Sequence, residues 1–363
     1  MSGGVDSSVA AWRLRREGRE LVGLFMRNGV HVEEHEADRK SCCSIGDARD
    51  ARMVASHLGI PFQAVDLSSE FQAIIRYFLA EYARGRTPNP CAVCNRDLKF
   101  DRLLSFATEL GADRVATGHY AQVGRTRAGR VQVLRGVDRS KDQSYQLFCV
   151  SEENLARTEL PLGAFQKRDV RAMAAEAGLR TAKKPDSQEI CFVPSNDYRN
   201  LLHEHEVELH PGNLVDTTGR VLGTHRGTEH FTIGQRRGLG VAAGTPLYVI
   251  EIVPETGTVV LGEQADCTTR ELELDDLNLI GFDPPADGVF RAEVQVRYHH
   301  RAAPATVEIL VQPAGGRRAR VTFDEPVLAV APGQGGALYS AEAAEDAPAG
   351  ERLLGGGWIG SRA

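Results

Sequence analysis

Apolar residues in the first part of the chain follow two patterns. Three short runs have the composition of buried strands, and three longer segments repeat apolar positions at the spacing of a helix. The predicted strands are residues 20–26, 62–67 and 114–117, and the predicted helices are residues 47–58, 71–82 and 98–110. Strands that alternate with helices of this length predict an α/β fold with a doubly wound parallel sheet, which binds ligands at the carboxyl ends of its strands.

Helical periodicity fades after about residue 200, and short β-like runs separated by turn sequences take its place. The runs are residues 213–216, 221–222, 247–253, 258–261, 290–297, 305–311 and 318–323. This pattern predicts a small β-rich connector followed by an antiparallel barrel or sandwich. We therefore expect three domains, at residues 1–198, 199–270 and 271–363.

Composition and charge narrow the class of protein. The 363 residues are 42% hydrophobic and 25% charged, which is ordinary for a soluble globular protein, and the sequence shows neither a membrane-spanning run nor a secretory signal. A cytoplasmic protein is expected. Because the formal net charge is −6, an RNA partner would need a local basic patch. The candidate patches, each of which taken alone favours a solvated face, are residues 125–130, 180–184, 236–237 and 297–301.

Residues 1–8, Met-Ser-Gly-Gly-Val-Asp-Ser-Ser, form a glycine-rich opening before a predicted helix at residues 9–14. The glycines let the backbone approach a ligand, and the serine hydroxyls and helix N-terminus suit a phosphate group. The run lacks the ending of a Walker loop and instead has the pattern of the pyrophosphatase loop in enzymes that adenylate a substrate. Asp6 is a candidate partner for Mg²⁺ on the phosphates. A flexible terminus is the competing interpretation, and because a strand should precede such a loop, we expect the true start to lie upstream.

Seven cysteines in a chain without an export signal argue against a framework of structural disulfides. Cys91 and Cys94 form a Cys-x-x-Cys at a predicted helix start, where the helix favours the thiolate. The pair could be half of a zinc site, although no second pair has suitable spacing. Cys191, in the apolar and strand-like residues 185–193, taken alone indicates a core thiol. Two thiols brought together can relay sulfur through a persulfide and a disulfide.

The other cysteines and one histidine have simpler interpretations. Cys42 and Cys43 follow a charged stretch and are predicted to be loop thiols, Cys149 is predicted to lie in the core, and Cys267 to pack at the surface or against the barrel. His119 follows a predicted strand, where an active-site role and a hydrogen-bonded core role are equally compatible with the sequence.

Seven stretches make the chain similar to the bacterial tRNA-uridine 2-sulfurtransferase family, the tRNA-specific 2-thiouridylases, over nearly its whole length. They are residues 2–8, 23–28, 87–100, 116–120, 141–145, 227–240, and 332–333 with 354–359. The runs over residues 141–145 and 232–240 are especially specific, and secondary-structure propensity explains neither. The resemblance implies a nucleotide-binding domain of the adenine-nucleotide alpha-hydrolase (PP-loop) type, a small β-rich connector and a C-terminal β-barrel that contacts tRNA.

The resemblance also implies a reaction. ATP adenylates O2 of the wobble uridine of tRNA, a persulfide received from a sulfur-donating protein (a cysteine desulfurase or a sulfur relay protein) attacks C2, and AMP leaves. Position by position, Cys94 matches the nucleophile of the family and Cys191 its persulfide carrier. The two would form a transient disulfide.

Binding residues are carried over in the same way. The matches to ATP contacts are Met1, Ser2, Gly3, Gly4, Val5, Asp6, Ser7, Met26 and Gly118. The matches to the segment beside the target base are Asn89, Pro90 and Cys91. The matches to tRNA contacts are Lys141, Asp142, Gln143, Arg297 and Tyr298. Stacking by Tyr298 and phosphate pairing by Arg297 suit a splayed-out anticodon base.

The chain departs from the family pattern at Cys91, where some members have an aspartate that could act as a general base. Cys91 could do so only as a thiolate. Alternatively, Cys91, Cys94 and Cys191 could hold an iron–sulfur cluster. Two further classes fit parts of the sequence: an amidating AMP-forming ligase would share the opening loop without needing both Cys94 and Cys191, and a non-catalytic RNA-binding protein would not need the intact loop.

Overall fold

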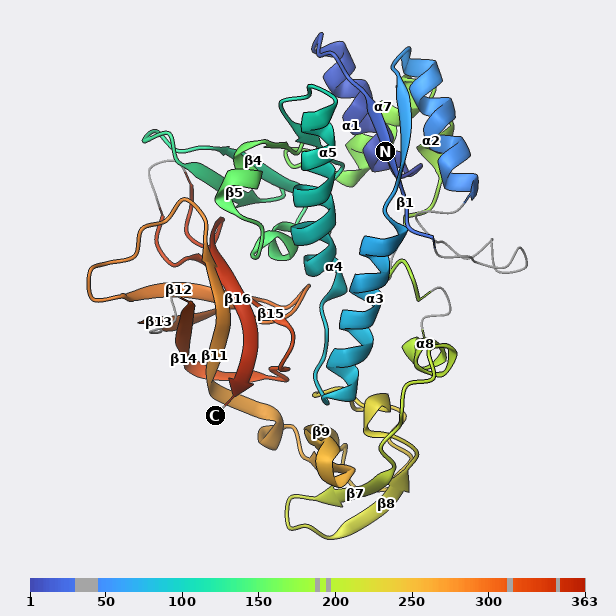
Figure 1. The fold of residues 1–363 in the computed structure, drawn as a ribbon. Coiled ribbons are helices and arrows are strands. Elements are labelled where there is room, and N and C mark those ends of the chain that lie inside the picture. Colours follow the sequence, from blue (N-terminus) through green and yellow to red (C-terminus); the bar gives the residue numbers. More distant parts are fainter. Residues whose placement is uncertain (30–44, 187–189, 194–196, 312–315, 344–346, 363) are drawn as a thin grey trace. The chain divides into compact units, whose positions relative to one another are not determined.

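The structure, a computed structural model, describes residues 1–29, 45–186, 190–193, 197–311, 316–343 and 347–362 (Figure 1). The chain is grouped into two compact units: Met1–Ile74 with Val93–Tyr198, and Ile75–Ala92 with Arg199–Ala363. The three domain ranges expected from the sequence stay a prediction. In the described part of the chain, no helix has the length and apolar character needed to cross a membrane.

The first unit alternates strands and helices as the hydrophobic pattern predicts. The elements up to its end, some of which continue into the second unit, are α1 (Val5–Arg16), β1 (Gly23–Arg27), α2 (Ile45–Leu58), β2 (Phe62–Asp66), α3 (Ser68–Ala83), α4 (Pro90–Val93), a π-helix (Cys94–Arg102), α5 (Leu103–Glu109), β3 (Val115–Ala116), β4 (Ala121–Arg125), β5 (Val131–Arg135), α6 (Glu152–Ala156), β6 (Thr158–Glu159), α7 (Lys167–Glu176) and α8 (Tyr198–Glu204). β1 pairs in parallel with β2, and β3 pairs in parallel with β6. The α/β class with parallel strands is confirmed.

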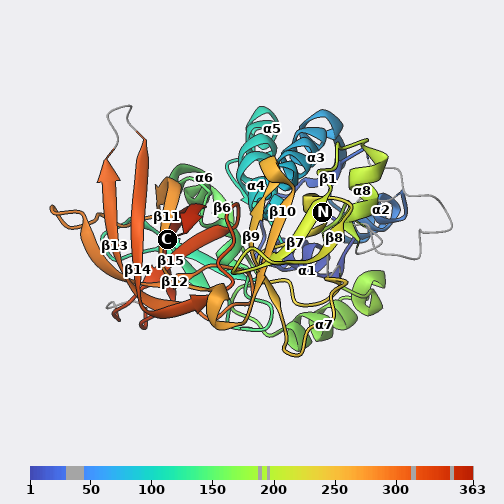
Figure 2. The same ribbon diagram turned by 90° about the horizontal axis from the view of Figure 1, so that it is seen from below.

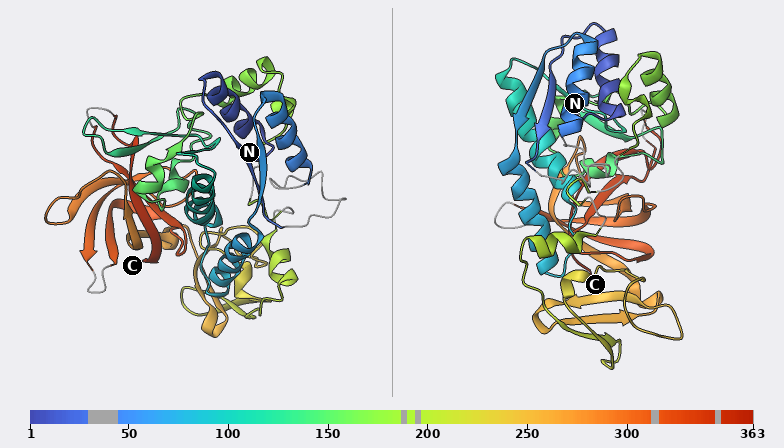
Figure 3. Two further views of the ribbon diagram at one scale, coloured as in Figure 1. Left: turned by 45° about the horizontal axis from the view of Figure 1, so that its top comes forward. Right: turned by 90° about the vertical axis from the view of Figure 1, so that its right-hand side faces the viewer.

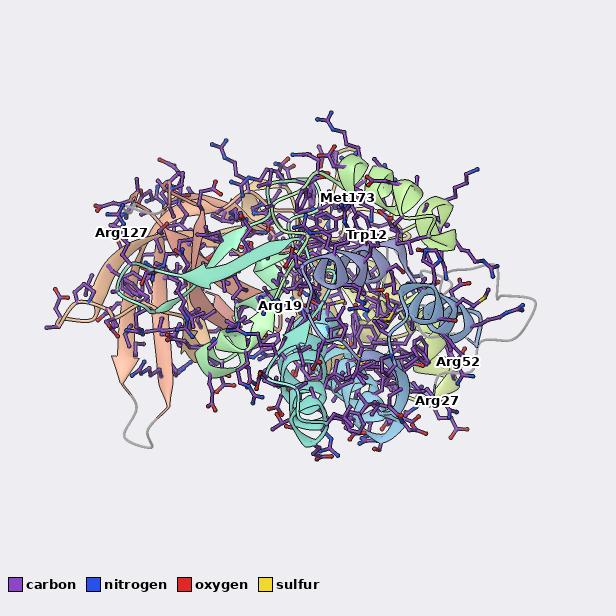
Figure 4. The ribbon with its side chains drawn as sticks, turned by 90° about the horizontal axis from the view of Figure 1, so that it is seen from above. Trp12, Arg19, Arg27, Arg52, Arg127 and Met173 are labelled. Atoms are coloured by element: carbon purple, nitrogen blue, oxygen red, sulfur yellow. The ribbon has the colours of Figure 1, made fainter. Side chains whose placement is uncertain are left out.

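Helices α1 and α7 pack together because each has small and branched apolar side chains on one face. The buried members of this cluster are Val5, Val9, Ala10, Val170 and Ala174. Trp12 and Met173, both labelled in Figure 4, pack against the cluster from the same two helices. The first turns of the two helices meet, as the ion pair between Asp6 and Lys167 shows.

The helical segment around the cysteine pair is longer than the predicted helix at residues 98–110. It begins at Pro90, continues as a nine-residue π-helix over Cys94–Arg102 and ends with α5. Proline suits the first helical turn, where its missing N–H needs no partner. The polar Asn95 and Arg96 interrupt the apolar spacing, so that spacing alone placed the start at residue 98, whereas the proline turn predicted a helix start at the cysteine pair. A long π-helical stretch is unusual, and such distortions are frequent at functional sites.

The second unit contains a four-stranded sheet with the order β8-β7-β10-β9. Its strands are drawn in yellow and orange in the right view of Figure 3. Its strands are β7 (Gly212–Asp216), β8 (Val221–His225), β9 (Tyr248–Val253) and β10 (Thr258–Gly262). β10 pairs in parallel with β7 and antiparallel with β9. Successive side chains of a strand point to opposite faces of a sheet, so one face can be apolar. The buried side chains of this sheet include Leu214, Val249 and Val259. These strands confirm the β-rich character predicted for the connector.

Six antiparallel strands of the second unit form a barrel, in the order β11-β14-β13-β12-β15-β16, which the pairing of β11 with β16 closes. Figure 2 shows β13 and β14 side by side. The strands are β11 (Thr268–Leu279), β12 (Val289–Gln295), β13 (Ala303–Val311), β14 (Arg317–Leu328), β15 (Gly335–Ser340) and β16 (Arg352–Arg362). The sequence left a barrel and a sandwich open, and the barrel is confirmed.

Strands β15 and β16 were not predicted, because they are rich in glycine, which is depleted in strands. The close packing of the barrel accounts for glycine at one of these positions. A Cβ at Gly336 would lie 2.4 Å from Cδ2 of Leu274, which is fully buried.

Candidate active site

The glycine-rich opening forms a tight loop ahead of α1. Gly3 has φ +71°, in the left-handed region, and a Cβ there would lie 2.3 Å from the carbonyl oxygen of Asp47, so only glycine fits. Gly4 is the extended residue before the helix, which begins earlier than predicted. Oγ of Ser7 turns back to accept a hydrogen bond from the Ser2 amide at 3.0 Å. The compact loop thus leads into the N-terminus of a 12-residue helix. The first backbone N–H groups of such a helix suit a phosphate group.

Gly118 meets this loop from the end of β3. A Cβ there would lie 2.7 Å from the carbonyl carbon of Asp6 and 2.8 Å from the backbone nitrogen of Ser7. The α-amino group of Met1 donates a hydrogen bond to the carbonyl of Leu24, on the strand that also carries Met26. The fold therefore gathers the residues that the sequence predicts as ATP contacts.

The carboxylate of Asp6, in the first turn of α1, accepts hydrogen bonds from two side chains. Nζ of Lys167 lies 2.7 and 2.8 Å from its two oxygens, and the Tyr120 hydroxyl donates to Oδ1 at 2.8 Å. Burial and the neighbouring Asp6 raise the pKa of Tyr120, so its hydroxyl stays a donor. The same Lys167 ammonium lies 2.9 Å from Oδ1 of Asp186. One lysine thus joins the opening loop to the segment that leads to Cys191.

Asp186 is the centre of a second group of ion pairs. Besides Lys167, its carboxylate contacts Nζ of Lys141 at 3.0 Å and Nη2 of Arg171 at 2.6 Å. Burial acts to raise the pKa of Asp186, but the hydrogen bonds from Lys167 and Lys141 outweigh burial and hold that pKa below its ordinary value. The carboxylate therefore stays charged among its cations.

Lys184 holds the opening loop from another direction. Its Nζ donates to the Gly3 carbonyl at 3.0 Å and contacts Asp47 at 2.6 Å and Asp50 at 2.7 Å. Burial acts to lower the pKa of Lys184, but the hydrogen bonds with the two aspartates raise it.

Sequence reasoning singled out neither Lys167 nor Arg171 as a site residue, and it gave Asp186 and Lys184 no individual role. The sequence did hold two hints of these contacts. Asp186 lies in the same segment as Cys191, and Tyr120 lies in a stretch of family resemblance. Lys167 had no local signal, since its partners Asp6 and Asp186 are distant in the sequence.

Cys94 is the first residue of the π-helix, and Cys91 precedes it by about one helical turn. Cys91 is exposed and Cys94 is half-buried. Asn89 is buried, and its Oδ1 accepts a hydrogen bond from the Ala92 amide at 3.2 Å, as a residue that caps a helix start does. The predicted position of the cysteine pair at a helix start is confirmed.

The segment before Cys91 is held by the connection between the barrel strands β14 and β15, in the same unit. The Thr87 amide donates to the Pro332 carbonyl at 2.8 Å, and Nε2 of Gln334 donates to the carbonyls of Thr87 and Pro88 at 3.2 and 2.8 Å. A Cβ at Gly333 would lie 2.8 Å from the Thr87 carbonyl oxygen. Two distant stretches of the family resemblance are therefore partners in the fold.

Cys191 lies on a turn, so the strand-like interpretation of its segment was wrong. The Val193 amide donates to the Ile190 carbonyl at 2.9 Å. Phe192 is buried and meets the ring of Phe71 edge-on, with centroids 5.7 Å apart. Buried anchors on the turn produce the apolar run, while Cys191 itself is half-buried rather than in the core.

The predicted tRNA contacts at Lys141, Asp142 and Gln143 belong to the first unit. Asp142 is buried, and the donors to its carboxylate are Arg135, the Gly136 amide, and the amide and hydroxyl of Ser144, at 2.9 to 3.0 Å. Oε1 of Gln143 accepts the Tyr120 amide at 3.0 Å. This run therefore shapes the backbone at Tyr120 and aims Lys141 at Asp186.

Arg297 and Tyr298, the other predicted tRNA contacts, follow β12 in the second unit. Arg297 is exposed and Tyr298 is half-buried, with its ring centroid 3.9 Å from that of His299. Arg297 is thus open to solvent and Tyr298 is partly so, and their contact with tRNA stays a prediction.

Gln235 ties part of the specific run over residues 232–240 into a turn. Its Oε1 accepts the Thr232 amide at 3.1 Å, and its Nε2 donates to the Arg237 carbonyl at 2.9 Å. Ile233 and Leu239 are buried in the core of the four-stranded sheet. The run is a turn tied by one glutamine side chain.

The remaining candidates are distributed as follows. His119 is buried and its Nδ1 lies 2.7 Å from Oγ1 of Thr117, as in the hydrogen-bonded core interpretation, and burial lowers its pKa well below its ordinary value. Cys149 is buried as predicted, and burial raises its pKa to about 12. Cys267 is buried too, with its sulfur 3.7 Å from the Val249 carbonyl. Cys42 and Cys43 lie outside the described residues.

Three family models match consecutive parts of the chain. The tRNA methyl transferase HUP domain matches residues 1–195, the tRNA methyl transferase PRC-barrel domain matches residues 199–263, and the aminomethyltransferase beta-barrel domain matches residues 269–359. Among solved structures, the U34-tRNA thiolase NcsA from Methanococcus maripaludis with its 4Fe-4S cluster is similar over 56% of this chain and 65% of that chain, with 17% identity and a TM-score of 0.34, too weak to bear on the fold or the chemistry.

Whole-chain relatives are much more similar. A tRNA-specific 2-thiouridylase MnmA from Carboxydothermus hydrogenoformans is 46% identical over 100% of this chain and 96% of its own length. Those from Geobacter metallireducens and Solibacter usitatus are 44% and 45% identical over 99% of this chain and 95% and 97% of their own lengths. The chain therefore belongs to the tRNA-specific 2-thiouridylase family of tRNA sulfurtransferases.

Proposed function

We propose that this chain binds ATP and uses it to replace O2 of the wobble uridine of tRNA with sulfur in the cytoplasm. One observation carries the proposal. The loop suited to phosphate and both Cys94 and Cys191 belong to the same compact unit, in a chain of a tRNA sulfurtransferase family. An ammonia-using ligase would need the loop but not both cysteines.

The proposed reaction has two stages. O2 of the uridine attacks the α-phosphate of ATP, which gives the O2-adenylate and pyrophosphate. The terminal sulfur of a Cys191 persulfide, received from a sulfur-donating protein, then attacks C2 and displaces AMP. The Cys94 thiolate attacks Sγ of Cys191, which releases 2-thiouridine and leaves a Cys94–Cys191 disulfide for a thiol reductant to open.

Asp6 fits the proposed role at Mg²⁺. Its carboxylate oxygens are the ligands that Mg²⁺ prefers, and they stand in the first turn of the helix at the proposed phosphate site. Bound there, Mg²⁺ would neutralise charge on the phosphates. The proposed ATP contacts are completed by Met26 and Gly118. The proposed segment beside the target base is Asn89, Pro90 and Cys91. The proposed tRNA contacts are Lys141, Asp142, Gln143, Arg297 and Tyr298. The proposed domains are residues 1–198, 199–270 and 271–363.

Replacing each proposed catalytic cysteine tests the mechanism. Cys94→Ser and Cys191→Ser should each abolish thiolation, measured by mass spectrometry of tRNA nucleosides, and leave tRNA binding within about threefold of wild type, because neither thiol is needed to hold the RNA. The buried Cys149→Ala is the matched control and should keep activity. Wild-type thiolation in either serine variant would contradict the two-thiol mechanism.

An iron–sulfur cluster on Cys91, Cys94 and Cys191 is the rival chemistry. Within the described residues, no group of three or more His, Cys, Asp or Glu side chains is arranged to hold a metal ion. Iron analysis and visible absorption of anaerobically purified protein distinguish the persulfide relay from the cluster. Bound iron is expected only for the cluster, since a persulfide relay needs no iron.

A further inference from the structure

Lys167 has no part in the proposed reaction, although it contacts the opening loop directly. It is the first residue of α7, and its backbone amide donates to Oδ2 of Asp138 at 2.9 Å. Its side chain is only 11% exposed and ends at Asp6. Both ends of this lysine are therefore fixed before any ligand binds.

The Lys167 ammonium uses its full set of donors on carboxylates. A lysine ammonium has three N–H groups. The Nζ distances are 2.7 and 2.8 Å to the two oxygens of Asp6 and 2.9 Å to Oδ1 of Asp186. Any change at Asp6 therefore frees two donors while the third keeps its partner.

Three cations and three carboxylates lie together beside the opening loop. Three cations, Lys167, Lys141 and Arg171, share the carboxylates of Asp6 and Asp186. The nearby Asp138 carboxylate is occupied by hydrogen bonds from Ser140 and from the backbone amide of Lys167. Lys167 lies at the N-terminus of α1, which is itself a positive end of a helix dipole. This arrangement suits an anion with several charges.

We propose that Lys167 binds the β- and γ-phosphates of ATP and the pyrophosphate formed from them, an assignment that rests on the proposed function. With Asp6 as a ligand of Mg²⁺ on the phosphates, the two N–H groups that Lys167 now gives to Asp6 would be available to phosphate oxygens. Asp186 would keep the third N–H group and hold the ammonium in place. In this proposal the phosphate oxygens replace the Asp6 carboxylate as acceptors of two hydrogen bonds from Lys167.

Calorimetric titration with inorganic pyrophosphate, ATP and AMP, each with Mg²⁺, tests the assignment. Lys167→Met should weaken the binding of pyrophosphate and ATP about tenfold or more, because charge-assisted hydrogen bonds to the phosphates are lost. AMP lacks these phosphates, so its affinity should stay within about twofold. A lysine that only supports the fold would change all three affinities together.

Two further variants keep the test decisive. Lys167→Gln keeps a polar side chain for Asp6 and Asp186 but carries no charge, and it should show the same split if Lys167→Met folds poorly. Arg168→Met changes the neighbouring cation, which is 84% exposed, and should leave all three affinities unchanged.

Parallel loss of affinity for AMP, ATP and pyrophosphate, or an unchanged affinity for pyrophosphate, would overturn the assignment. If the wild-type chain binds neither ATP nor pyrophosphate, the proposed function itself fails. If it binds both and Lys167→Met binds them equally well, only the role of Lys167 fails.

Discussion

Several charged side chains beside the opening loop form ion pairs with residues that are distant in the sequence. Asp6 and Lys167 are 161 positions apart, and Lys184 reaches Asp47 across 137 positions. Each pair combines a short distance with partial burial, so solvent screens it less than an exposed pair. Removing one partner leaves the other charge uncompensated, which is costly in a partly buried site.

His210 and Glu229 make the stability of the second unit depend on pH. Nδ1 of His210 lies 2.5 Å from Oε1 of Glu229, whose side chain is fully buried. The hydrogen bond with Glu229 raises the pKa of His210 above its ordinary value of 6.5. Because the folded-state pKa is raised, the stabilisation is complete below the unfolded-state pKa and is lost as the pH rises through the folded-state pKa.

We therefore expect His210→Ala to lower the midpoint of thermal unfolding more at about pH 5.5 than at about pH 8.5. His225 supplies the opposite sign, because burial lowers its pKa and its stabilisation is lost as the pH falls. His225→Ala should therefore have its larger effect at the higher pH. Scanning fluorimetry across this range measures both, and the same pH trend in the two variants would disprove the argument.

At the scale of elements, the turn over residues 232–240 shows how backbone conformation and close packing select glycine at different positions of one run. Gly234 has φ +83°, and a Cβ there would lie 2.4 Å from Cβ of Ala329. Gly240 has φ +72°, but nothing lies within 4 Å of a Cβ there. The two glycines therefore share the backbone conformation and differ in the space around them.

We expect Gly240→Ala to reduce the free energy of unfolding by about 1–2 kcal/mol, the usual cost of a left-handed residue with a side chain. Gly234→Ala should cost about 1–3 kcal/mol more, because it also overpacks the turn against Ala329. Chemical denaturation of the full chain, followed by circular dichroism, compares the two variants. Equal destabilisation would mean that Ala329 moves aside and that backbone conformation alone selects glycine.

At the scale of the whole molecule, a protein with net charge −6 has to bind a polyanion. Binding then depends on local cations that are free to meet phosphates. On the barrel, exposed Arg297 contrasts with Arg291, whose guanidinium pairs with Asp324 at 2.5 and 2.8 Å. The two arginines come from one strand and its continuation, and they make a matched pair.

Arg297→Ala should weaken tRNA binding and reduce the slope of log affinity against log salt by about 1, since one phosphate contact is lost. Arg291→Ala should leave the slope unchanged, because that charge is already paired within the barrel. Filter binding over a range of salt concentrations measures both slopes. A slope that does not change in Arg297→Ala would remove this residue from the tRNA contacts.

Local features of the sequence were sufficient for most elements. The alternation of strands and helices up to β3, the β-rich second half, the opening loop and the helix start at the cysteine pair follow from periodicity, glycine and proline. These signals depend on neighbours within a few residues, so they can be read without the fold. The segment of Cys191 was misjudged because Phe192 and Val193 are buried on a turn, which apolar composition cannot distinguish from a strand.

By itself, the sequence determined the α/β class, the loop, the candidate cysteines and the family resemblance. Only the tertiary structure decided that Lys167 bridges Asp6 and Asp186, and that Gln334 holds the segment before Cys91. The reason is physical. Hydrogen bonds within a helix or turn join near neighbours, whereas ion pairs and carbonyl contacts across more than a hundred positions exist only after packing brings their partners together.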